Sequence, residues 1–118
     1  MDGVFWAVDD SQRKLEFTGK ICDISANGIK VVPDKKYESI ISSLNVGQKL
    51  LFSSFDDYKI YQSSRMDFVQ GEAVIKWIVN KPTDISLGCY IDKPSKELRE
   101  YVENKKVAGF IDSGYLII

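Results

Sequence analysis

Histidine is absent from this sequence of 118 residues, and cysteine and proline are scarce, with two and three residues. Without histidine the chain lacks the commonest general base and the commonest metal ligand of proteins, which argues against hydrolytic chemistry. The two cysteines, Cys22 and Cys89, are too few for a disulfide scaffold and are not at metal-ligand spacing. Both lie in apolar runs, which predicts buried core residues in a reducing cytoplasm.

Neither charge sign is in excess, and long apolar runs are missing. The 16 basic and 17 acidic residues are interspersed and give a formal charge of −1, with no basic stripe for a nucleic-acid backbone. We find no signal peptide and no run long enough to cross a bilayer, so nucleic-acid binding and membrane insertion are not expected. A hydrophobic content of 44% predicts one folded domain over residues 1–118.

The first third of the chain predicts three β-strands, at Val4–Val8, Leu15–Cys22 and Ile29–Val32. In the second of them, apolar and polar residues alternate with the period of a half-buried strand. After Pro33 the apolar residues recur at helical spacing instead: Tyr37, Ile40, Ile41 and Leu44. This pattern predicts an inserted helix of about three turns, capped by Asp34 and ended near Gly47.

The second half predicts further strands and a final helix. Strands are expected at Gln48–Phe52, near Tyr58–Tyr61, and at Ile85–Ile91, with a turn at Asp56-Asp57 and a break in the pattern at Ser63–Arg65. The longest strand should place five apolar residues on its inner face, with Gly71 at a bulge or bend: Val69, Ala73, Ile75, Trp77 and Val79.

Pro94-Ser95 is a good helix entry, and the apolar stripe after it predicts a C-terminal helix over residues 93–106. Residues 107–118 form an apolar tail that ends in Tyr115–Ile118. Four consecutive apolar residues should not remain free in solution. We expect the tail either to fold back on the domain or to form a homodimer or partner contact.

The spacing of these elements predicts a mainly β domain with six or seven antiparallel strands, because short turns leave no room for parallel crossovers. A closed barrel is favoured over an open sheet, since closure removes the edge strands. One short inserted helix and one C-terminal helix complete the expected fold.

The stretch Asp23–Gly28 (Asp-Ile-Ser-Ala-Asn-Gly) lies between two predicted strands, and we call it the corner. Asp and Ser side chains bind nearby backbone groups, and Asn-Gly tolerates positive φ. The ordinary interpretation is a tight turn. On that interpretation the carboxylate of Asp23 accepts backbone N–H bonds across the corner, and replacing it costs about 1 kcal/mol.

The spacing Asp-x-Ser-x-x-Gly also resembles a signature of the PilZ family, small bacterial β-barrels that typically bind cyclic di-GMP. Further pieces of the sequence agree in order: Gly47–Phe52, Ala73–Trp77 and Leu87–Tyr90, followed by the C-terminal helix. The resemblance covers nearly the whole chain. It implies a PilZ-like barrel in which Asp23 and Ser25 help hold a guanine edge and Gly28 allows close backbone approach.

One half of the family's ligand site is missing from this sequence. PilZ receptors carry an Arg-x-x-x-Arg segment ahead of the first strand, whereas Arg13 is the only arginine before the corner. That segment would precede Met1, and nothing in the pattern brings Arg65 or Arg99 to the corner. Losing two arginines that bond and stack should weaken nucleotide binding by several decades.

Two functions follow from the resemblance, and one comes from outside it. The first is a non-enzymatic regulatory or adaptor module that acts through an unidentified protein partner and binds cyclic di-GMP weakly or not at all. The second is a genuine cyclic di-GMP receptor whose arginine clamp comes from outside this chain. The third, an enzyme using paired carboxylates or magnesium at Asp9-Asp10 and Asp56-Asp57, is not favoured, because acidic pairs in turns are ordinarily solvated. We expect no catalytic residues, metal or cofactor.

Overall fold

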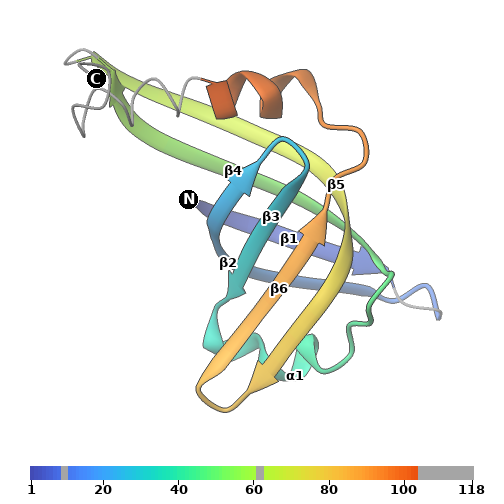
Figure 1. The fold of residues 1–118 in the computed structure, drawn as a ribbon. Helices are drawn as coiled ribbons and strands as arrows, with labels where there is room; N and C mark the ends of the chain where they lie inside the picture. The colour runs from blue at the N-terminus through green and yellow to red at the C-terminus, as the bar shows by residue number, and fades with distance from the viewer. Residues whose placement is uncertain (9–10, 61–62, 104–118) are drawn as a thin grey trace.

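Six β-strands form a closed antiparallel barrel in a computed structural model of the chain (Figure 1). The structure describes residues 1–8, 11–60 and 63–103, with the backbone alone described for 56–60 and 63–67. The strands are β1 (Asp2–Val8), β2 (Lys14–Ser25), β3 (Gly28–Pro33), β4 (Lys49–Ile60), β5 (Ser63–Lys81) and β6 (Asp84–Tyr90). Around the barrel they run in the order β1-β2-β3-β6-β5-β4. The expected mainly β, antiparallel barrel is confirmed.

Along each strand, alternate side chains point into the barrel and form its core. In β1 and β2, residues such as Phe5 and Phe17 are fully buried, and their stacked rings have centroids 5.2 Å apart. Every second residue points outward, as the period of two requires. The fully buried large apolar side chains come from all six strands, from the inserted helix and from the chain after β6: Phe5, Phe17, Val31, Ile41, Leu50, Phe52, Val69, Ile75, Leu87, Ile91 and Leu98.

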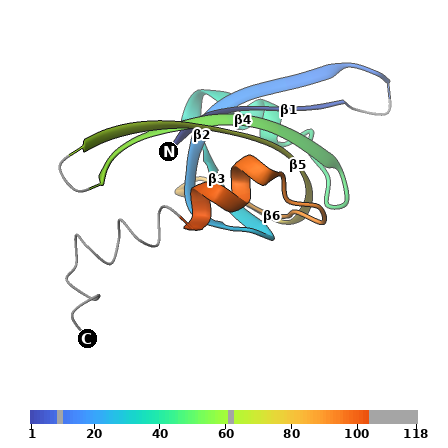
Figure 2. The same cartoon turned by 90° about the horizontal axis from the view of Figure 1, so that it is seen from above.

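The β4–β5 ribbon is longer than the sequence pattern predicts. Asp56 and Asp57 lie within β4, opposite Asp67 and Met66 of β5, so the expected turn at this position is wrong. Ser63–Arg65 likewise does not interrupt the sheet. Twelve consecutive pairs join the two strands, and this ladder carries polar residues that have low strand propensity alone. Figures 1 and 2 show the ribbon extending beyond the barrel.

The inserted helix is shorter than expected. It consists of a 3₁₀ turn, η1 (Lys35–Tyr37), and one α-helical turn, α1 (Glu38–Ile41). Asp34 makes no side-chain cap, because its carboxylate instead accepts a hydrogen bond from the Thr18 hydroxyl at 2.5 Å. The segment nevertheless covers one end of the barrel, since Ile41 is buried there.

The C-terminal helix begins at residue 96 and is described as far as 103. Ser95 caps it, because its hydroxyl accepts the Leu98 N–H at 3.1 Å and donates to the Gln70 carbonyl at 3.3 Å. Residues 93–95 precede the helix rather than belonging to it. Leu98 and Tyr101 are buried and join the barrel core. The predicted tail, residues 107–118, lies outside the described residues.

Two β-bulges change which side chains face outward. Register shifts occur between Ile21 and Asp23 and between Ile75 and Trp77. Beyond the second bulge, Trp77 leaves the inner face and becomes 43% exposed. Cys22 is exposed, not buried as expected, because it follows the inward-facing Ile21 on the outer side of β2. A one-residue insertion reverses the faces of the residues beyond it, which alternation in the sequence does not reveal.

The bulge expected at Gly71 is not at that residue. A side-chain Cβ at Gly71 would lie 2.8 Å from Cζ of Phe52, so the glycine instead makes room for that ring in the core. Gly47 meets its expectation of a positive φ, with a value of 93°, but it lies six residues beyond the end of α1 and does not end the helix.

Candidate functional site

The corner is a tight β2–β3 hairpin that is anchored to the end of β6. Ser25 and Gly28 are paired, with Ala26 and Asn27 between them, and the Ser25 hydroxyl donates to the Gly28 carbonyl at 3.4 Å. The Ile91 N–H donates to the Asn27 carbonyl at 2.8 Å, and the Asn27 amide donates to the Ile91 carbonyl at 3.3 Å. These bonds hold the turn against a strand that is distant in sequence.

Gly28 is required by close packing rather than by a positive φ. None of the described residues of the corner has a positive φ, which differs from the expectation for Asn-Gly. A Cβ at Gly28 would lie 3.2 Å from the Cys89 carbonyl oxygen. The glycine therefore allows β3 to approach β6 closely.

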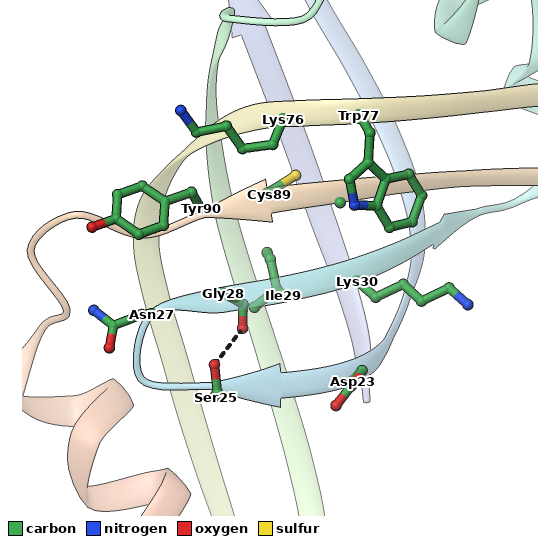
Figure 3. A pocket seen from close by; sticks show the side chains of 11 residues that line it. Asp23, Ser25, Asn27, Gly28, Ile29, Lys30, Lys76, Trp77, Cys89 and Tyr90 are labelled. Atoms are coloured by element: carbon green, nitrogen blue, oxygen red, sulfur yellow. Dashed lines mark hydrogen bonds between the residues drawn. The ribbon is translucent and has the colours of Figure 1, made fainter.

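An open hollow of about 420 Å³ lies beside the corner on the outer surface of the barrel (Figure 3). Asp23, Ser25 and Gly28 all line it, so the structure brings the three predicted site residues together. The remaining lining comes from β3, β5, β6 and the turn: Asn27, Ile29, Lys30, Lys76, Trp77, Gly88, Cys89 and Tyr90.

The carboxylate of Asp23 is exposed and accepts no hydrogen bond within the described part of the chain. The backbone bonds expected across the corner are therefore not formed. The bulge after Ile21 places Asp23 opposite Lys30 of β3, on the outer side of the sheet. This position leaves the carboxylate open toward the hollow.

Four polar or aromatic residues that line the hollow were not predicted from the sequence as site residues: Lys30, Lys76, Trp77 and Tyr90. The indole of Trp77 lies over Gly88, where a Cβ would come within 2.0 Å of the ring atoms Cε2 and Nε1. The ammonium group of Lys76 lies 5.5 Å from the ring centroid of Tyr90. One sequence signal could have indicated this part of the hollow: a tryptophan, Trp77, and a glycine, Gly88, at similar positions in the two strands of one predicted hairpin.

A second hollow of about 670 Å³ lies on the other side of the corner, against the C-terminal helix. Ser25 and Asn27 line both hollows, and Arg99 lines this one. The expectation that Arg99 stays away from the corner is therefore wrong. Helix 96–103 is folded over the barrel by its buried residues, and this packing brings Arg99 there.

The electrostatics of the site contain one clear pKa shift. Burial raises the pKa of the Cys89 thiol to about 12. The thiolate is the nucleophilic form of cysteine, so Cys89 remains a neutral thiol at pH 7. The wall of the hollow therefore carries no cysteine nucleophile.

Metal ligands are not clustered in the described part of the chain. Among the residues whose side chains the structure describes (1–8, 11–55 and 68–103), no group of three or more Cys, Asp or Glu could hold a metal ion. Asp9-Asp10 and the side chains of Asp56-Asp57 lie outside what the structure describes, so the carboxylate pairs are not placed. No helix of the described residues is long and apolar enough to cross a membrane.

Comparison with known proteins finds no match: no family model fits the chain, and no curated protein or solved structure is significantly similar to it.

Proposed function

We propose that this chain is a non-enzymatic, cytoplasmic regulatory module of the PilZ type, which acts through contacts with a protein partner. The resemblance to bacterial cyclic di-GMP signalling domains and the closed six-stranded barrel agree with this proposal. The observation that carries it is the outer side of β1, β4 and β5. It bears the apolar residues Val4, Trp6, Val8, Leu51, Phe55 and Phe68, which we call the apolar face.

The apolar face is unusual for the outside of a small barrel. Val4, Val8, Phe55 and Phe68 are 37%, 50%, 45% and 64% exposed. The outward residues of an antiparallel sheet are ordinarily polar when that side meets water. Contiguous apolar patches on a folded protein commonly mark interaction sites. The face lies opposite the side covered by helix 96–103, which packs into the core (Figure 2).

Nucleotide binding by this chain alone should be weak. The corner offers the Asp23 carboxylate, the Ser25 hydroxyl and the Gly28 backbone to a guanine edge. The cations at the hollow are Lys30 and Lys76, and a lysine cannot stack on a base or grip a phosphate bidentately as arginine does. Contacts of this kind support a dissociation constant above about 100 μM.

Titration of cyclic di-GMP into the purified chain, followed by amide NMR shifts, tests the proposal. We expect small, non-saturating shifts near the corner at submillimolar ligand. Gly28→Ala is the control, because its Cβ approaches the Cys89 carbonyl and should abolish any true corner shifts. Saturable shifts with a low-micromolar constant at residues 23–28 would contradict the proposal.

The second candidate is a cyclic di-GMP receptor whose arginine clamp comes from outside this chain. The position of Met1 favours it: its backbone N and O bond Ile21 at 3.1 and 2.8 Å. A segment joined ahead of Met1 in the same direction would pass beside Asp23. Trp77 supplies a partly exposed aromatic surface at the same hollow.

Adding an Arg-x-x-x-Arg segment ahead of Met1 distinguishes the two candidates. If the hollow is a receptor site that lacks only its clamp, the extended chain should bind cyclic di-GMP at least tenfold more tightly than one with an Ala-x-x-x-Ala extension. Equal affinities of the two extended chains would exclude the receptor and leave the protein-contact module.

A further inference from the structure

The apolar face contains a hollow whose charges indicate what a partner protein must present to it. The hollow has a volume of about 300 Å³, is lined by residues of β1, β2, β4 and β5 and by Asp34, and is called the face hollow below. We infer that the protein partner of this module inserts an arginine side chain into the face hollow; this inference rests on the proposed protein-contact function.

Apolar side chains form one part of the face hollow. Val4, Phe55 and Phe68 line it and are exposed to solvent. The rings of Phe55 and Phe68 have centroids 6.3 Å apart, because the two residues are paired across β4 and β5. On its other side Phe55 is paired with Asp2 of β1. A side chain that enters the hollow therefore meets aromatic rings next to a carboxylate.

Two carboxylates form the other part of the face hollow. Asp2 and Asp34 line it, and no lysine or arginine is among the described residues that do so. The Asp34 carboxylate accepts a hydrogen bond from the Thr18 hydroxyl, whereas the Asp2 carboxylate has no partner in the described part of the chain. The lining of the hollow is therefore acidic.

Two lysines lie near these carboxylates without pairing with them. Lys20 is opposite Asp2 on β2, and Lys35 follows Asp34 in the chain. Neither lysine lines the face hollow, and neither makes an ion pair with any residue that the structure describes. The carboxylates of the hollow remain open to a cation from outside.

Burial of the face makes such a cation necessary. A partner that covered the face with apolar side chains alone would remove both carboxylates from water without a counter-charge, which opposes association. A cation in the hollow gives the carboxylates charged hydrogen bonds while the apolar residues are covered. Arginine suits the hollow better than lysine, because its planar guanidinium stacks on an aromatic ring while its N–H groups bond carboxylate oxygens. Arginine is also enriched among the residues that dominate interface energies.

Three short peptides, titrated into the full chain at low salt, test the inference. The probe is acetyl-Leu-Arg-Leu-amide, and the two matched peptides carry lysine or citrulline, the uncharged isostere of arginine, in its place. Amide NMR shifts should be largest at residues 2–4, 18–19, 53–55 and 68, with a dissociation constant of about 1 mM for the arginine peptide. The lysine peptide should bind at least about twofold more weakly and the citrulline peptide at least about fivefold more weakly.

Variants of the chain test which groups attract the peptide. Asp2→Asn and Asp34→Asn should each weaken binding of the arginine peptide at least about threefold and leave binding of the citrulline peptide unchanged. Lys20→Ala should tighten binding about twofold, because it removes a neighbouring cation, and a folding defect would not produce this gain. Glu97→Gln is the matched control: it removes one negative charge from the exposed side of helix 96–103, away from the apolar face, and should leave the affinity unchanged (Figure 2).

Three results would overturn the inference: no shifts at the face hollow with about 5 mM arginine peptide, equal affinities for the arginine and citrulline peptides, or full affinity in both aspartate variants. Equal affinities for the arginine and lysine peptides would overturn the choice of arginine. These outcomes differ from failure of the proposed function. Loss of the arginine preference leaves a protein partner of other chemistry, whereas low-micromolar binding of cyclic di-GMP rejects the proposed function itself.

Discussion

Replacing Gly88 by alanine should destabilise the protein through one side chain, Trp77. The new Cβ would lie 2.0 Å from Cε2 and Nε1 of the indole and 2.5 Å from Cζ2. Ordinary carbon contacts are near 3.5 Å, so the ring must retreat by about 1.5 Å or turn away. Gly88 does not have a positive φ, so alanine itself causes no backbone strain.

The size of the effect follows from the contact that the indole loses. If the retreat exposes about 80 Å² of apolar surface, the cost is about 2 kcal/mol at 25 cal/mol per Å². Alanine recovers about 0.5 to 1 kcal/mol, because it restricts the unfolded chain more than glycine does. The net loss in the free energy of unfolding should be about 1 to 1.5 kcal/mol.

Trp77→Ala should reverse the sign of this effect. Without the indole there is nothing for the alanine Cβ to displace, so Gly88→Ala should then stabilise the protein by about 0.5 kcal/mol. Urea unfolding followed by far-UV circular dichroism measures all four members of the cycle. The m values should agree, because all four expose similar surface on unfolding.

Gly47→Ala is the matched control for this cycle. Gly47 has a φ of 93°, and no atom lies within 4 Å of the Cβ that alanine would add, so its substitution causes strain rather than a clash. It should cost about 1 kcal/mol with or without Trp77. If Gly88→Ala costs the same in both backgrounds, the packing of Trp77 on Gly88 does not explain the glycine.

The remaining predictions concern the site, the two cysteines and the tail. Asp23→Ala should change the free energy of unfolding by less than about 0.5 kcal/mol in urea, since its carboxylate is exposed and without a described hydrogen bond; a loss above about 1 kcal/mol would restore the structural role. A thiol reagent at pH 8 should modify Cys22 alone in the folded chain and both cysteines in urea, because Cys22 is exposed and Cys89 is buried; two rapid reactions in the folded chain would contradict the burial. Since folding raises the pKa of Cys89 from 9.0 to about 12, its contribution to stability is fully present below pH 9 and should be lost between pH 9 and 12, an effect that Cys89→Ala removes. Deleting residues 114–118 should leave the oligomeric state in sedimentation unchanged if the tail folds back on the domain; a change in that state would assign a dimer contact to the tail.

Most of the strands could be predicted from the sequence, because apolar residues at every second position lie on one side of a strand, and that side must face the core of the barrel. Phe5, Phe17 and Ile75 face the core as their patterns indicate. The corner was also predictable as a turn between two strands, and Asp23, Ser25 and Gly28 do meet at one hollow. The faces of these strands and the position of the turn depend on residues that are close together in the sequence, so the local pattern is sufficient to predict them.

Other features depended on partners that are distant in sequence. The extension of β4 through Asp56-Asp57 comes from pairing with β5, which outweighs the low strand propensity of these residues. Asp34 bonds Thr18 of β2 rather than capping the inserted helix, and α1 ends already at Ile41. Both incorrect predictions concern segments whose intrinsic preference for one secondary structure is weak.

The sequence by itself determined the fold class, the buried faces of the regular strands and the turn that carries the candidate site. Tertiary structure alone decided the walls of that site and the apolar face. A bulge between Ile75 and Trp77 turns the indole outward onto Gly88, and helix packing brings Arg99 to the second hollow. The reason is physical: alternation records which residues are apolar, whereas a bulge or a packed helix sets which of them meet, and that depends on strand register across the whole barrel.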